Sequence, residues 1–67
     1  MTRGTVKWFI AEKGSGFIAQ DGDGPDVFAH YRDIVGTGYR ELCEGERVVF
    51  DISQSPRGLQ AQNITRH

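Results

Sequence analysis

Apolar and polar residues alternate in short runs along this chain, and no run keeps a helical period for about ten residues. The clearest run has apolar residues at every second position from Val48 to Ile52. Val, Ile, Thr and aromatic residues fill the runs, and Gly, Asp and Pro separate them, which is typical of strands joined by turns. The pattern predicts five strands, at residues 5–10, 16–20, 26–30, 47–53 and 59–65.

The segment between the third and fourth strands, residues 31–46, is too polar and too often broken by glycine to be a good strand. It is predicted as a long loop with one helical turn near residues 32–34. Five short strands with one long connection indicate a small all-β barrel, closed or nearly closed, because closure removes exposed sheet edges. A chain of 67 residues forms one domain, here residues 1–67, which is too small for a deep catalytic cavity. We therefore expect a binding surface.

The composition of the chain excludes several kinds of binding and several kinds of site. The net charge is −1, so the chain is not a polycation that bulk charge alone would hold on nucleic acid. The longest apolar run, Trp8 to Ala11, is too short for a membrane span or a signal-peptide core, and the expected location is the cytoplasm. The single cysteine, Cys43, cannot form an intrachain disulfide or a Cys-rich zinc site, and we expect it to be a small apolar filler.

Strand alternation predicts which aromatic residues face solvent. In the second strand Ile18 is the natural inward residue, which turns Phe17 outward. In the third strand the same alternation turns Phe28 and His30 outward. If these strands pair as a hairpin, the three rings share one exposed surface, and an aromatic surface rimmed by lysines suits unpaired nucleic-acid bases. The positive N-terminal segment supplies two such cations, Lys7 and Lys13.

A simpler interpretation of the same residues is open at this point. Single exposed aromatic residues are common on protein surfaces. Phe17 and Phe28 could form an ordinary cross-strand pair, or pack beneath the loop of residues 31–46. Alternation alone does not separate this interpretation from a binding face.

Two segments resemble the nucleic-acid-binding motifs of the cold-shock domain family: residues 13–18 (KGSGFI) the first, and residues 26–30 (DVFAH) the second. Residues 4–9 (GTVKWF) resemble the opening strand of the family, and residues 44–50 and 57–61 (RGLQA) resemble its closing half. The resemblance covers essentially the whole chain, at the length of a free-standing bacterial cold-shock protein.

The resemblance implies a five-stranded antiparallel OB-fold-type barrel that binds single-stranded RNA and DNA, without a cofactor and without enzymatic activity. Such proteins act as RNA chaperones and transcription antiterminators; we expect a monomer, with a strand-exchanged dimer left open. Tyr31 and Tyr39 stand where the family usually has Phe, and either ring can stack. The nucleic-acid contacts that the resemblance carries over are Lys7, Trp8, Lys13, Phe17, Phe28, His30, Tyr31, Tyr39 and Arg57.

Some positions depart from simple alternation or from the family pattern. Lys7 and Trp8 are adjacent, so both can reach one ligand only if the strand has a bulge or twist, or if Lys7 reaches around from the rim. Ser15 replaces the usual Phe of the first motif, which removes one stacking surface. Ile10 replaces the usual Asn at the end of the first strand, and Leu59 replaces the Pro that usually follows Arg-Gly.

Other motifs in the chain carry less weight. Residues 14–19 match the dinucleotide fingerprint G-x-G-x-x-A, but a strand and a turn follow instead of a helix. Residues 21–26 resemble the start of a calcium loop. The sixth position of that loop is Asp26 instead of Gly, and the twelfth is Arg32 instead of Glu, so we expect a polar turn. His30 has no metal-ligand partners in sequence, and no catalytic signature surrounds Cys43. Three carboxylates are expected to form one solvated face, Glu41, Glu44 and Glu46.

Two other functions are compatible with a small aromatic barrel. One is an SH3-like barrel that binds a peptide through its aromatic groove. The other is a structural subunit whose aromatic surface is buried by a partner. Lys13 next to the first motif favours nucleic acid, because a proline-rich peptide has no phosphates for a lysine to meet.

Overall fold

Each predicted run of alternating residues forms a strand in the computed structural model, which describes residues 1–22, 24–36 and 41–66. The five predicted strands are confirmed, with ends that differ by a few residues, and the predicted helical turn is the short 3-10 helix η1. The elements are β1 (Thr2–Ile10), β2 (Ser15–Gln20), β3 (Val27–His30), η1 (Tyr31–Asp33), β4 (Arg47–Ser55) and β5 (Gly58–Arg66).

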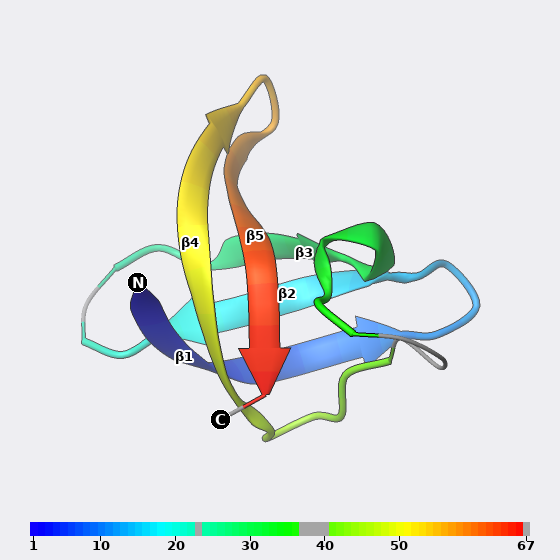
Figure 1. Ribbon diagram of the computed structural model, residues 1–67. Coiled ribbons are helices and arrows are strands. Elements are labelled where there is room, and N and C mark those ends of the chain that lie inside the picture. Colours follow the sequence, from blue (N-terminus) through cyan, green and yellow to red (C-terminus); the bar gives the residue numbers. More distant parts are fainter. Residues whose placement is uncertain (23, 37–40, 67) are drawn as a thin grey trace.

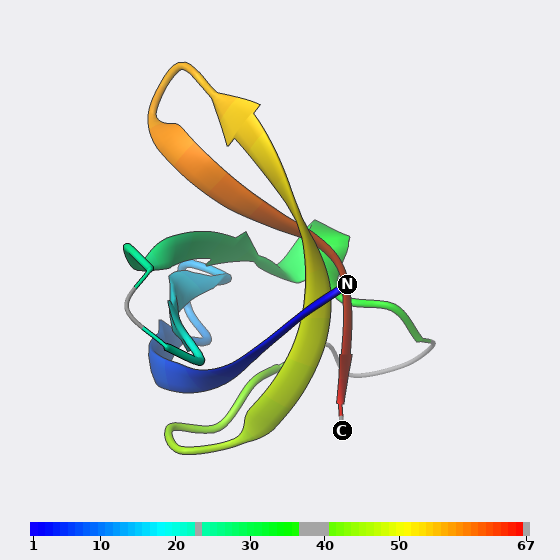
Figure 2. The same cartoon turned by 90° about the vertical axis from the view of Figure 1, so that its left-hand side faces the viewer.

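The five strands close into a barrel in the order β1-β2-β3-β5-β4. Neighbouring strands are antiparallel except at the contact between β3 and β5, which is parallel and pairs Phe28 with Gln60. Figure 1 shows β4 and β5 crossing in front of β1, β2 and β3. The far end of the β4–β5 hairpin extends beyond the barrel and past β3 (Figure 2). The barrel predicted from the sequence is therefore confirmed, with one parallel contact completing it.

The core follows the predicted alternation. Ile18, Val27 and Ala29 are fully buried, as expected for the inward positions of β2 and β3. Ile52 departs from the pattern: it is 38% exposed, because a register shift between Val49 and Asp51 interrupts the alternation along β4. Among the described residues, ten apolar side chains form the core: Val6, Ile18, Val27, Ala29, Ile34, Leu42, Val48, Phe50, Ala61 and Ile64.

An ion pair on the outside of the barrel joins the end of β2 to the start of β4. Both terminal nitrogens of Arg47 donate to the Asp21 carboxylate, at 2.8 Å and 2.7 Å. These hydrogen bonds, together with the positive charge of Arg47, lower the pKa of Asp21 below its ordinary value. The pair is solvent-exposed, so its contribution to stability is small.

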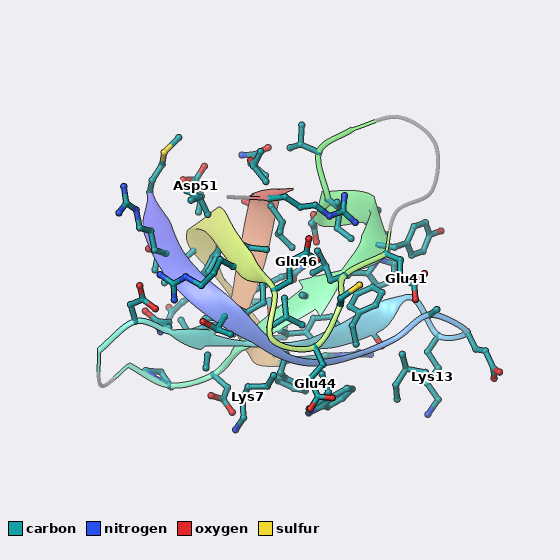
Figure 3. All side chains as sticks on the ribbon, turned by 90° about the horizontal axis from the view of Figure 1, so that it is seen from below. Lys7, Lys13, Glu41, Glu44, Glu46 and Asp51 are labelled. Carbon is teal, nitrogen blue, oxygen red and sulfur yellow. The ribbon has the colours of Figure 1, made fainter. Side chains whose placement is uncertain are left out.

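The predictions for Cys43 and for the acidic residues are wrong. Cys43 is exposed, because it lies in a turn where its backbone N–H donates to Glu46 Oε1. The three carboxylates do not share one face. Glu46 is partly buried and binds Arg66 at 2.8 Å. Glu44 is exposed and extends to the side of the barrel from which Lys7 and Lys13 project (Figure 3).

Candidate nucleic-acid interface

Five rings form a continuous series on the outer surface of β1, β2 and β3, and we call this series the ring ladder. Its members are Trp8, Phe17, Phe28, His30 and Tyr31. The ring centroids are 5.3 Å apart for the Trp8–Phe17 pair and 5.7 Å for Phe17–Phe28. They are 6.4 Å apart for Phe28–His30 and 4.6 Å for His30–Tyr31. Each ring therefore contacts or nearly contacts the next.

Strand register places these rings together. Phe17 lies directly opposite Phe28, and Trp8 lies directly opposite Phe17, so three strands each contribute a ring to one row. Phe17, Phe28 and His30 are partly buried, whereas Trp8 and Tyr31 are 42% and 47% exposed. The predicted outward face is confirmed. The Phe17–Phe28 cross-strand pair also exists, and it forms part of this surface.

A bulge in β1 brings Lys7 and Trp8 to the same side of the sheet. Val6 pairs with Ile18 and Trp8 pairs with Phe17, which leaves Lys7 as the extra residue of β1. Of the alternatives stated above, the bulge is the one observed. Lys7 Nζ lies 2.9 Å from Asp26 Oδ2, an ion pair that the sequence did not predict.

Gly14 explains how Tyr31 reaches the ladder. Gly14 has φ of +67°, and a Cβ atom at this position would lie 2.5 Å from Cδ1 of the Tyr31 ring. The Tyr31 N–H donates to the Gly14 carbonyl at 2.8 Å. The Tyr31 ring therefore packs directly on the Gly14 backbone, in space that the Cβ atom of any other residue would occupy. At this same N-terminal end of η1, the cap residue His30 accepts a hydrogen bond at Nδ1 from the backbone N–H of Arg32, which orients the imidazole.

Cations lie around the ladder. Lys7, within β1, and Lys13, in the loop between β1 and β2, project on the same side of the sheet (Figure 3). Arg57, in the turn of the β4–β5 hairpin, borders two hollows that flank Phe28. One hollow, of about 510 Å³, is also lined by Phe17 and by Leu59, the residue that replaces the usual proline. The hairpin therefore forms a wall beside the rings.

Two departures from the family pattern lie on this same face. Ser15 is paired with Ile10 on one side and with His30 on the other, so these three residues form a row across β1, β2 and β3. Ser15 is the first residue of β2 and is partly buried, so the strand begins one residue before its predicted start. Ile10 is 40% exposed beside it. Sequence reasoning missed Ile10 as a surface residue of the site, although alternation from Trp8 would have found it.

Eight of the nine predicted contact residues belong to this one surface. Five are the rings of the ladder, and the cations Lys7, Lys13 and Arg57 surround them. The ninth, Tyr39, lies outside the described residues. Within the described part of the chain, no group of three or more His, Cys, Asp or Glu side chains is placed to hold a metal ion. No helix in that part is long and apolar enough to cross a membrane.

Comparisons with known proteins agree with this geometry. The family model of the "Cold-shock" DNA-binding domain matches residues 2–67. The chain is 68% identical over 65 residues to the cold shock protein ScoF of Streptomyces coelicolor, covering 97% of each chain. It is 53% identical over 66 residues to the major cold shock protein of Micrococcus luteus, covering 98% of each.

A solved structure shows the same fold at low sequence identity. The chain resembles Drosophila Unr CSD456 with a TM-score of 0.79 and 24% identity; the match covers 98% of this chain and 26% of that one. The family match and the bacterial relatives agree with the five-stranded barrel and together establish the family of this chain. This chain belongs to the cold-shock DNA-binding domain family, a family of nucleic-acid-binding proteins that are not enzymes.

Proposed function

We propose that this protein binds single-stranded RNA and DNA by stacking unpaired bases on the ring ladder. In a bacterial cytoplasm it would act as an RNA chaperone and transcription antiterminator, as a monomer made of one cold-shock domain over residues 1–67. The observation that supports this most is the unbroken series of rings from Trp8 to Tyr31 across three strands. Each stacked base contributes about 1–3 kcal/mol, so a few stacked bases suffice for useful affinity.

The ladder favours unpaired bases over duplex. The faces of paired bases are already covered by their neighbours in a double helix, so they cannot stack on protein rings without being unpaired. An RNA chaperone needs this preference, because it must hold strands open without competing for duplex. Stacking also tolerates any base, since every base has a π-face.

Charge has a smaller part in this proposal. Few cations surround the ladder, and Lys7 already has a carboxylate partner in Asp26. The protein carries a net charge of −1. Binding therefore releases few counterions, and affinity should depend only weakly on salt. Phosphate contacts would position the strand, while the rings supply most of the binding free energy.

A fluorescence titration tests the proposal. Trp8 is the only tryptophan, so its emission reports directly on the ladder. A T-rich strand of about seven nucleotides should quench Trp8, and a duplex of the same sequence should compete poorly. A proline-rich peptide serves as the control for the peptide-binding alternative and should leave the emission unchanged. Equal affinity for duplex and single strand, or quenching by the peptide alone, would refute the proposed mechanism.

A further inference from the structure

Arg32 lines two neighbouring hollows, and among the described residues it alone is shared by both. The first hollow, of about 330 Å³, contains Phe28 and His30 of the ring ladder and is bordered by Arg57. The second, of about 410 Å³, lies between η1 and β5 and contains no ring of the ladder. We call it the η1–β5 hollow. Its lining residues are Arg32, Asp33, Ile34, Val35, Gly36, Gln62 and Asn63.

The backbone fixes the shape of the η1–β5 hollow. Ile34 forms a parallel bridge with Ile64 of β5, and the Val35 N–H donates to the Ile64 carbonyl at 2.8 Å. Ile34 and Ile64 are both buried in the core. Since these contacts tie the segment after η1 to β5, the hollow is preformed and a ligand need not order it.

The chemistry of the hollow suits a nucleotide. Gln62 brings an exposed side-chain amide, which can hydrogen-bond to a base edge, a sugar or a phosphate. Asn63 also lines the hollow, but its Nδ2 already donates to Asp51 Oδ2 at 3.2 Å. Val35 is 55% exposed and offers apolar contact. Arg32 supplies a planar donor group suited to phosphate.

The guanidinium of Arg32 is available for such a contact. The four ion pairs found in the described residues involve the N-terminus, Lys7, Arg47 and Arg66, and none involves Arg32. The neighbouring carboxylate, Asp33, accepts a hydrogen bond from the Gln60 amide at 3.0 Å. This carboxylate therefore has a hydrogen-bond partner other than Arg32, and it remains a negative charge beside the hollow.

We propose that Arg32 binds a phosphate of a strand that leaves the ring ladder past His30, and that the η1–β5 hollow receives a further nucleotide of that strand. This inference rests on the proposed function, because it extends the same single-strand path. Continuity with the ladder through the shared Arg32 is what identifies the occupant as nucleic acid. The consequence is a binding site longer than the ladder itself.

Strand length and charge removal together test the inference. The native protein and Arg32→Gln are titrated with homothymidine strands of about six and about ten nucleotides, using Trp8 emission. A longer strand offers more overlapping binding registers, which tightens its apparent Kd for the native protein and the variant alike. The ratio of the two Kd values, taken at each strand length, removes this effect. We expect a ratio near one for the short strand and about threefold to tenfold for the long strand. The slope of log affinity against log salt should fall by about 0.7 for the long strand only.

Two further variants make the test specific. Arg3→Gln removes the same charge from an exposed position on β1, opposite Val49 of β4, and should leave both ratios near one. Val35→Lys adds a cation to the η1–β5 hollow alone and should tighten the long strand about threefold while leaving the short strand unchanged. Thermal unfolding confirms that each variant is folded.

The outcomes separate this inference from the proposed function. If the short strand quenches Trp8 but the Arg32→Gln ratio is the same for both lengths, the η1–β5 hollow is not a binding site and only the inference fails. If Arg3→Gln and Arg32→Gln have equal effects, the contribution is bulk charge and the inference is wrong. If the native protein binds neither strand, the proposed function fails and the inference with it.

Discussion

The two faces of the β2–β3 hairpin are formed by alternate residues of the same two strands, and they differ in burial. On the inner face Ile18 and Val27 are paired and completely buried. On the outer face their neighbours Phe17 and Phe28 are also paired but only partly buried. Both faces are apolar, so hydrophobicity alone does not distinguish them. Their difference is that the barrel covers one face and leaves the other open, which allows stability and binding to be changed separately.

The largest expected effect is on the inner face. Ile18→Ala removes a fully buried side chain from a core of ten residues and should lower the free energy of unfolding by about 2–5 kcal/mol. A small domain has only a few kcal/mol of stability, so the variant should be largely unfolded near room temperature. Urea denaturation monitored by circular dichroism measures this. A loss below about 1 kcal/mol would mean that Ile18 does not hold the barrel together.

On the outer face the same type of change should act on binding. Phe17→Ala and Phe28→Ala should each weaken single-strand binding by about 1–3 kcal/mol, because each removes a stacking surface of the ladder. Their effect on unfolding should be smaller than that of Ile18→Ala, since both rings are partly exposed. Affinity and unfolding are measured on the same preparations. If these variants lose stability but the fraction that stays folded binds with native affinity, Phe17 and Phe28 serve the core and not the binding surface.

A ring added to the outer face should have the opposite effect on binding from a ring removed. Ser15 lies on the outer face opposite His30, where it offers a hydroxyl but no π-face. Ser15→Phe should tighten single-strand binding by about 1 kcal/mol, a several-fold gain, with little change in stability. Paired titrations of native protein and variant with one T-rich strand at fixed salt measure this gain. Unchanged or weaker affinity would show that a neighbouring ring already covers that base.

Much of this arrangement could be predicted from the sequence because strand alternation has a period of two. The inward position of Ile18 and the outward positions of Phe17 and Phe28 follow from that period, and the structure confirms them. A bulge at Lys7 was one of the alternatives that the adjacency of Lys7 and Trp8 left open, and the strand register shows that the bulge is present.

Contacts between distant segments could not be predicted in this way. The Lys7–Asp26 ion pair depends on how the β2–β3 loop approaches β1, which no local pattern encodes. Cys43 is exposed because a hydrogen bond to Glu46 sets the course of the turn, although its residue type suggested burial. The exposure of Ile52 depends on the register shift between β4 and β5 just before it.

The smallest expected effect concerns an outer contact that serves stability rather than binding. Arg47 lowers the pKa of Asp21 in the folded protein. The stabilisation is therefore present above the unfolded-state pKa and is lost as the pH falls through the lower folded-state pKa. Native protein should have a slightly higher Tm than Asp21→Asn at about pH 7, and this difference should vanish at about pH 2. A difference that grows on acidification would contradict the assignment, and single-strand affinity should be equal in both proteins.

In the proposed mechanism the outer rings bind the bases, and charge contributes less than stacking to the binding free energy. The most direct test compares a homothymidine strand of about seven nucleotides with an abasic strand of the same length, which keeps every phosphate and lacks every base. We expect the abasic strand to leave Trp8 emission unchanged and to bind at least about a hundredfold more weakly, since two or more stacking contacts are lost. Comparable affinity for the two strands would show that phosphates, and not the ring ladder, hold the nucleic acid.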